Sequence, residues 1–337
     1  MLEAGGSEPG FINEQEALRR APWFKGANPC VEILLGNKSF CNLTETDISK
    51  FKGDTAGLHD AIRLAARANY RQTCVNLKDG ILQEAWHLNN YFLRLCGVGL
   101  TGIAMRPDMT SYDYEYLKRT ATSSAISMAD ELGLPRPKNI TCIKPSGTLS
   151  KIMDCTEGVH KPLGKYIFNN VQFGIHDPLI PLLRDAGYKV INHPTDPTGV
   201  LVTFPVEWKD VPFHKEAGKE VNLETAIEQL ERYKLLQTSW TQQNTSVTIS
   251  YDPSEVTEII DWLLNNWDCY VGVSFIYRAD PTKTAQDLGY LYLPQEVVDE
   301  YTFRKYVQDL KPIDVEAGNS FDELLDDECA SGVCPVR

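Results

Sequence analysis

The chain is best interpreted from one stretch, Asn28-Pro29-Cys30-Val31-Glu32-Ile33-Leu34-Leu35-Gly36-Asn37-Lys38-Ser39-Phe40-Cys41. Pro29 fixes its own φ and favours extended geometry at Asn28. Because side chains at i and i+2 of an extended segment point the same way, we expect Asn28, Cys30 and Glu32 to project from one face. An amide, a thiol and a proton-accepting carboxylate on one edge would form a compact reactive set. The alternative is ordinary packing, with a buried cysteine beside a surface glutamate.

Composition and charge restrict the class of protein. The 337 residues are 42% hydrophobic and 23% charged, which is ordinary for a globular protein. The net charge is −13 and Lys and Arg are scattered, which argues against binding to a nucleic acid polymer or a membrane surface. No signal peptide and no apolar run of about 18 residues is found, so we expect an intracellular, cytoplasmic protein. The nine cysteines show no zinc-type spacing, so we expect free or redox-active thiols and no metal site.

Hydrophobic periodicity predicts the main elements. Two long helices are expected over residues 55–74 and 111–132. From Gly174 onward, predicted strands alternate with predicted helices, which indicates an α/β fold with a largely parallel sheet. The strands are expected near 189–192, 200–205, 246–250 and 270–277, and the helices over 222–237 and 254–266.

Gly97, Gly99 and Gly102 form a G-x-G-x-x-G pattern that has two interpretations. A dinucleotide-binding loop would need a strand before the pattern, a helix after it and an acidic residue about 20 positions later. An apolar helix leads into the pattern instead. This context argues against a dinucleotide site.

A second candidate site follows a predicted strand over 139–143. The chain continues as Lys144-Pro145-Ser146-Gly147-Thr148-Leu149-Ser150, a turn that leads into a helix. A strand, a small-residue turn and a helix can hold a phosphate group through backbone N–H groups and the helix dipole. The alternative is an N-capping turn that binds no ligand, because Ser and Thr are preferred caps.

The C-terminal end carries a cysteine pair. An acidic segment over 321–328 precedes Cys329 and Cys334, and its composition predicts a flexible tail. Two cysteines this close on a flexible tail can form a disulfide and meet an external reductant. The alternative is an unstructured tail whose cysteines have no role.

Several of these segments together resemble ribonucleotide reductases. Asn28-Pro29-Cys30-x-Glu32, followed by Phe40-Cys41, resembles the active-site loop of that family, and the terminal Cys-x4-Cys resembles its thiol-shuttle tail. The segments around 8–13, 97–102, 145–148, 240–250 and 271–280 are also similar to family segments, and the resemblance implies that 97–102 is a barrel strand whose glycines permit close packing. The resemblance extends from about Ser7 to the last residue, but it covers only the later part of the family's catalytic subunit. It implies an α/β fold that forms the second half of a ten-stranded α/β barrel.

The resemblance also implies roles for the residues of the active-site loop. Cys30 would carry a thiyl radical that abstracts the 3′-hydrogen of a ribonucleotide. Glu32 would be the general base for the 3′-OH, and Asn28 would hydrogen-bond the ribose hydroxyls. Cys41 would be one half of the dithiol that reduces the substrate. The remaining five cysteines, Cys74, Cys96, Cys142, Cys155 and Cys269, are expected to be buried packing residues.

Two other sites take their roles from the same resemblance. The turn Pro145, Ser146, Gly147, Thr148 and Leu149 would bind the substrate phosphates. Cys329 and Cys334 would reduce the active-site disulfide and would then be reduced by thioredoxin or glutaredoxin.

The class of reductase is inferred from features that the sequence lacks. The oxygen-dependent class uses two adjacent tyrosines, and none of the 15 tyrosines here is adjacent to another. The anaerobic class carries its radical on a glycine in an R-V-x-G-Y-type motif, which Asp287-Leu288-Gly289-Tyr290 does not match. These departures favour the class that uses adenosylcobalamin as cofactor.

The expected organisation is one half-barrel over residues 1–315, with a finger loop over about 26–45, and a tail over 316–337. The family's dithiol partner for Cys41 lies in the first half of the barrel, which this chain does not contain. We therefore expect a split or truncated enzyme that needs an N-terminal half in trans. The alternatives are a non-catalytic remnant or interaction subunit, and a glycyl-radical enzyme that shares the barrel.

Overall fold

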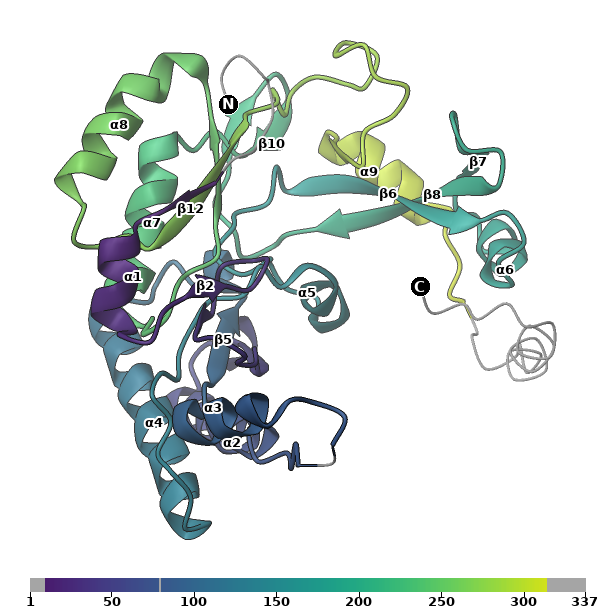
Figure 1. The fold of residues 1–337 in the computed structure, drawn as a ribbon. Helices are drawn as coiled ribbons and strands as arrows, with labels where there is room; N and C mark the ends of the chain where they lie inside the picture. The colour runs from purple at the N-terminus through teal and green to yellow at the C-terminus, as the bar shows by residue number, and fades with distance from the viewer. Residues whose placement is uncertain (1–9, 79, 314–337) are drawn as a thin grey trace. The chain divides into compact units, whose positions relative to one another are not determined.

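The computed structural model describes residues 10–78 and 80–313, which form two compact units (Figure 1). The larger unit comprises the described residues up to Pro162, together with Asp210–Pro212 and Leu223–Ala279. The smaller unit comprises Leu163–Lys209, Phe213–Asn222 and the described residues from Asp280 onward. The sequence analysis did not anticipate this division. The predicted tail over 316–337, with Cys329 and Cys334, lies outside the described residues.

The helices of the larger unit begin where capping side chains are available. The Asp54 side chain accepts a hydrogen bond from Gly57 at the start of α2 (Thr55–Gln72). Reciprocal capping boxes begin α4 (Ser111–Glu131) and α7 (Ala226–Ser239). Together with α8 (Val256–Asn265), these helices confirm four predicted helices. The remaining helices of this unit are α1 (Glu14–Arg20), α3 (Glu84–Leu93) and α5 (Gly147–Met153), with 3-10 turns at Ile48–Phe51, Ile103–Met105 and Pro253–Glu255.

Five parallel segments of the larger unit lie side by side. The strands here are β1 (Phe11–Ile12), β2 (Gly26–Ala27), β3 (Leu34–Leu35), β4 (Leu43–Asp47), β5 (Gly97–Thr101), β11 (Thr248–Tyr251) and β12 (Gly272–Tyr277). β4 pairs with β5, and β11 pairs with β12, both in parallel. Parallel bridges at Val98–Thr141 and Ile143–Thr245 place residues 140–143 between these two pairs. The order is therefore β4, β5, 140–143, 244–251 and β12. Among the described residues no closed barrel forms, and no strand pairs with the other edge of β4.

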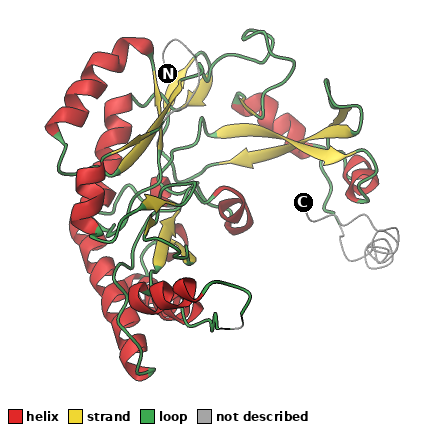
Figure 2. Ribbon diagram, viewed as in Figure 1, coloured by secondary structure: helices red, strands yellow, loops and turns green. Residues whose placement is uncertain are grey.

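The glycines of β5 let the finger loop pack closely against these five parallel segments. A Cβ on Gly97 would lie 2.5 Å from Leu43 Cδ2 and 2.7 Å from Ile33 Cδ1, so glycine is required there. Val98 and Leu100 alternate with the glycines and join the main hydrophobic core, which also takes residues from α2, α4 and α7. Helices thus cover one side of these strands (Figure 2). The interpretation of 97–102 as a tightly packed strand is confirmed.

The smaller unit is an antiparallel sheet with two helices. Its elements are β6 (Tyr166–Gly174), α6 (Leu179–Asp185), β7 (Val190–Asn192), β8 (Gly199–Glu207), β9 (His214–Glu216), β10 (Lys219–Val221), β13 (Gln295–Val297) and α9 (Glu300–Gln308). The main sheet has the order β13-β6-β8-β7, and every pair in it is antiparallel. The expected largely parallel sheet is therefore wrong for this unit. The short turn between β7 and β8 allows only antiparallel pairing, because a parallel pair needs a long crossover.

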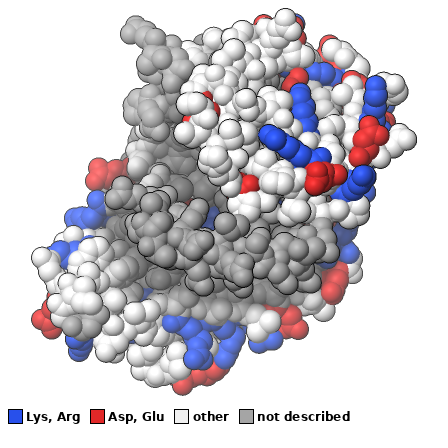
Figure 3. Space-filling view, turned by 90° about the vertical axis from the view of Figure 1, so that its right-hand side faces the viewer, with Lys and Arg blue, Asp and Glu red and all other residues white. Residues whose placement is uncertain are grey.

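The surface charges are mixed rather than segregated. On the coloured part of the face drawn in Figure 3, Lys and Arg lie interspersed with Asp and Glu. This arrangement agrees with the scattered basic residues of the sequence. Within residues 10–78 and 80–313, no helix combines the length and the apolar character that crossing a membrane requires.

Candidate active site

The finger loop (residues 26–45) places Cys30 at the tip of a short hairpin. Gly26 and Ala27 of β2 pair with Leu35 and Leu34 of β3 in antiparallel register, and the segment between them forms the tip. Leu34 is fixed on both sides, because its N–H donates to Gln243 Oε1 at 3.0 Å and its carbonyl accepts from Trp23 Nε1 at 3.2 Å. The stem of the loop is therefore held by side chains from distant parts of the sequence.

The tip is a turn and not the extended segment expected from Asn28-Pro29. Val31 N donates to Asn28 O at 2.8 Å, and Ile33 N donates to Asn28 Oδ1 at 2.9 Å. Val31 adopts a left-handed backbone conformation with φ +62°. Cys30 is exposed, whereas Glu32 has only 2% relative exposure. The expectation that Asn28, Cys30 and Glu32 share one face of an extended strand is therefore wrong, because the turn reverses the alternation between Cys30 and Glu32.

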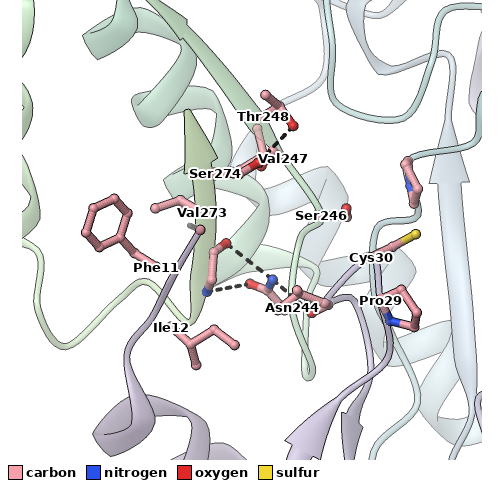
Figure 4. Close-up of a pocket in the computed structure, with 14 residues that line it drawn as sticks. Phe11, Ile12, Pro29, Cys30, Asn244, Ser246, Val247, Thr248, Val273 and Ser274 are labelled. Carbon is pink, nitrogen blue, oxygen red and sulfur yellow. Dashed lines mark hydrogen bonds between the residues drawn. The ribbon is translucent and has the colours of Figure 1, made fainter. Parts of the chain in front are cut away.

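Cys30 borders a pocket of about 380 Å³ in the larger unit (Figure 4). Its lining includes Pro29 and Cys30 from the finger loop, Pro145 from the predicted phosphate turn, and the hydroxyl residues Ser246, Thr248 and Ser274. The hydroxyl groups of Thr248 and Ser274 lie 2.9 Å apart. The pocket therefore combines an exposed thiol with neutral hydrogen-bonding groups, which suits a polyhydroxylated ligand.

The negative charge of Glu32 affects the pKa of both loop cysteines. Desolvation raises the pKa of the Cys30 thiol, and the negative charge of Glu32 raises it further. Partial desolvation raises the pKa of Cys41 to about 12, with further contributions from Glu32 and Cys30 and an opposing one from Lys144. The two loop thiols are therefore held protonated near neutral pH, a state that favours hydrogen-atom or proton donation over reaction as a free thiolate.

Glu32 is an unusual carboxylate. No described residue forms a hydrogen bond with its Oε2. Glu45 also has one carboxylate oxygen, Oε1, that accepts no hydrogen bond from a described residue, although Lys144 Nζ lies 3.4 Å from its Oε2. Buried polar atoms are nearly always paired, so a free carboxylate oxygen indicates a group kept available for a proton or a ligand.

The predicted phosphate turn lies in the same unit. Pro145 lines the pocket, and Ser146, with φ +65°, directly precedes α5. Ser146 is buried, whereas Gly147 and Thr148 are exposed and Leu149 is half-buried. The predicted turn before a helix is therefore confirmed, and the structure brings its first residue to the pocket that holds Cys30.

Sequence reasoning missed several residues around this site. Gln243 and Asn244, both fully buried, contact the finger loop, and Glu45 at the end of the loop forms an ion pair with the half-buried Lys144. Cys142 was predicted only to be a packing residue. Desolvation raises its pKa, and the negative charges of Glu32 and Cys41 raise it further. The polar run Gln242-Gln243-Asn244-Thr245 between a predicted helix and a predicted strand was the available signal. Of the five packing cysteines, four are buried as expected, and Cys74 is half-buried.

Comparison with known proteins finds relatives that match almost the whole chain. No protein-family model matches the chain. The chain is 28% identical over 98% of its length to the adenosylcobalamin-dependent ribonucleoside-triphosphate reductase of Levilactobacillus brevis, of which it covers 49%. It is 25% identical over 99% of its length to the enzyme of that name in Lacticaseibacillus paracasei, of which it covers 50%. The chain is similar to adenosylcobalamin-dependent ribonucleoside-triphosphate reductases over almost its whole length. It matches their C-terminal part and spans about half the length of these curated relatives.

A solved structure supports the fold. A B12-dependent (class II) ribonucleotide reductase superposes on 95% of this chain with a TM-score of 0.79 and 23% sequence identity, and the match covers 48% of that protein. The α/β fold of this chain is therefore that of a class II ribonucleotide reductase over the matched region. The resemblance drawn from the finger loop is confirmed.

Proposed function

We propose that the chain carries the thiyl-radical site of a ribonucleotide reductase and acts as one piece of a split or truncated enzyme. The observation that carries this proposal is the geometry at the finger loop. An exposed cysteine borders a pocket, and a buried carboxylate with one free oxygen is two residues away in sequence and raises the pKa of that cysteine. Buried packing would not require an exposed thiol beside an unpaired acid.

The proposed reaction assigns one step to each loop residue. The Cys30 thiyl radical takes the 3′-hydrogen of the ribonucleotide, and Glu32 accepts the 3′-OH proton as the 2′-OH leaves as water. Cys41 and a partner thiol supply two electrons and two protons and become a disulfide: one proton completes the departing water, the other becomes with the two electrons the new hydrogen at C2′, and Glu32 returns its proton to the 3′ oxygen. Cys30 then returns a hydrogen atom to C3′. The Asn28 amide oxygen already accepts from Ile33, so its NH2 group is the part that would bind a ribose hydroxyl.

The cofactor implied by the relatives is adenosylcobalamin. When bound, it supplies an organic radical that can remove the hydrogen atom of a cysteine thiol. Cys30 would be the thiol that gives up this hydrogen atom, because it is exposed and borders the pocket, and Pro29 next to it would also face the cofactor.

The phosphate turn 145–149 is proposed to hold the substrate phosphates. Its support is the position of Pro145 on the pocket and the start of α5 two residues later. Backbone N–H groups at a helix start can bind phosphate oxygens without a basic side chain. This mode of binding agrees with a chain whose net charge is −13.

The other half of the site is proposed to come from an N-terminal half of the reductase. The five parallel segments would be half of a ten-stranded barrel, and β4 would be the edge at which the other half pairs. An unpaired strand edge presents free N–H and C=O groups that readily bind another strand. The N-terminal half would also supply the partner thiol for Cys41. Cys329 and Cys334 would shuttle electrons from thioredoxin or glutaredoxin.

We expect Glu32→Gln to lower nucleotide reduction by about 10²–10⁴-fold, the usual contribution of a general base. The same change should speed alkylation of Cys30 by iodoacetamide. Removing the negative charge of Glu32 lowers the pKa of Cys30, which leaves more thiolate at a given pH. The measurement is turnover of the chain assembled with an N-terminal half, with peptide mass spectrometry of alkylated Cys30. Full activity of this variant would contradict the role of Glu32 as base.

A further inference from the structure

Val31 lies between the two reactive residues of the loop in a conformation that it should avoid. Its φ of +62° falls in the left-handed region, which β-branched residues rarely adopt. Cys30 on one side of it is exposed, and Glu32 on the other is buried. A return of Val31 to ordinary extended geometry would change the direction of one of these side chains relative to the other. The surroundings must therefore stabilise this turn.

Asn244 supplies that support from a distant part of the chain. Its Nδ2 donates to Val31 O at 3.0 Å and to Gly272 O at 3.3 Å. Its Oδ1 accepts from Tyr233 OH at 3.0 Å and from Gly272 N at 3.4 Å. Its backbone N–H donates to Glu32 O at 3.2 Å. An amide side chain has two donor hydrogens and two acceptor lone pairs, and all four are used here.

The groups around Asn244 fix its orientation. Tyr233 OH accepts from Val271 N at 3.0 Å and donates to Asn244, so the phenol orients the amide. Burial raises the pKa of Tyr233 well above its usual value, which keeps the hydroxyl proton in place. A Cβ on Gly272 would lie 2.7 Å from Val31 Cγ1, so only glycine lets β12 approach the turn this closely. Asn244, Pro29 and Cys30 line the same pocket, and the hydrogen bonds between Asn244 and Gly272 are drawn in Figure 4.

We propose that Asn244 is a positioning residue that holds Val31 in the left-handed conformation and thereby sets Cys30 outward and Glu32 inward. Its importance for the reaction rests on the proposed function. Asn244 acts through the backbone of Val31 and Glu32 and is not assigned contact with the reacting atoms. It differs from Gln243, which holds the stem of the loop at Leu34 and not its tip.

The test measures the alkylation rate of Cys30 by iodoacetamide in the full chain, using peptide mass spectrometry. We expect Asn244→Ala to lower this rate about tenfold, because the turn relaxes toward extended geometry and no longer holds the exposed Cys30 thiol outward. The matched control is Asn69→Ala, which removes another fully buried amide, one that accepts from Gly97 N at 2.8 Å. This control should leave the Cys30 rate unchanged. Asn244→Asp keeps the shape but loses both donors, and it replaces Asn244→Ala if that variant does not fold.

Rescue separates positioning from a general structural role. Glycine adopts positive φ about as readily as negative φ, so Val31→Gly should keep the turn without the hydrogen bond from Asn244. In the Val31→Gly background, Asn244→Ala should therefore change the Cys30 rate by no more than about twofold. An equal effect of Asn69→Ala, an unchanged rate in Asn244→Ala, or a tenfold effect that persists with Val31→Gly would each overturn the proposal. The assay needs no nucleotide or cofactor, so its result is independent of whether the chain reduces nucleotides.

Discussion

Cys30→Ser is expected to abolish nucleotide reduction by the assembled enzyme while leaving nucleotide binding nearly intact. Serine is close to cysteine in shape, so the exposed tip of the finger loop should keep its structure. An alcohol O–H bond is too strong to be broken and re-formed in the way that a thiol S–H bond can be. The loss should therefore appear in turnover and not in affinity. The measurement is deoxyribonucleotide formation alongside the equilibrium binding of the substrate.

The matched control for this change is Cys74→Ser. Cys74 is also partly exposed, but it lies at the end of α2 and its thiol donates to Tyr70 O at 3.5 Å, away from the pocket. This variant should retain activity close to that of the parent. More than trace turnover by Cys30→Ser would mean that the radical thiol has been assigned to the wrong residue.

Replacing both tail cysteines, Cys329→Ser with Cys334→Ser, should separate the reaction from recycling. The tail is remote in sequence from Cys30, so we expect the pre-reduced enzyme to complete about one turnover, since each turnover oxidises one active-site dithiol. With thioredoxin as reductant the variant should then stop. A small dithiol can diffuse to the active-site disulfide, so it should restore part of the steady-state rate, because exchange requires only access and a suitable thiol pKa.

The informative quantity is the ratio of the thioredoxin-driven rate to the rate driven by a small dithiol. This ratio should fall strongly in the double variant relative to the parent. A ratio equal to that of the parent would show that the tail cysteines take no part in recycling, whatever the absolute rates.

Local sequence signals predicted the parts of the fold that depend on nearby residues. The periodic apolar positions and capping residues gave α2, α4, α7 and α8, because a helix is stabilised by contacts three and four residues apart. The glycines of β5 were correctly assigned to close packing, since no strand precedes them as a dinucleotide loop requires. For the finger loop, residue types and spacing suggested a reactive set at Asn28, Cys30 and Glu32, and the family resemblance supplied the role proposed for each.

The features that sequence reasoning missed depend on contacts between distant residues. The left-handed turn at Val31 accepts a hydrogen bond from Asn244, which is 213 positions away, and nothing within residues 28–41 reveals that contact. Pro29 alone suggested an extended segment. The sheet of the smaller unit was missed for the same reason. The long strand β6 was not predicted, and its pairing with β8 and β13 makes the sheet antiparallel.

The most direct test of the account is reduction of a ribonucleotide by this chain together with an N-terminal half of a class II reductase. The assay contains adenosylcobalamin and a small dithiol, and deoxyribonucleotide is measured by chromatography. We expect no product from either piece alone and product from the mixture, because the chain carries Cys30 and Cys41 whereas the partner thiol and the strands that pair with β4 come from the other half. Product from the purified 337-residue chain alone, or none from a mixture in which the two pieces are shown to associate, would contradict the account.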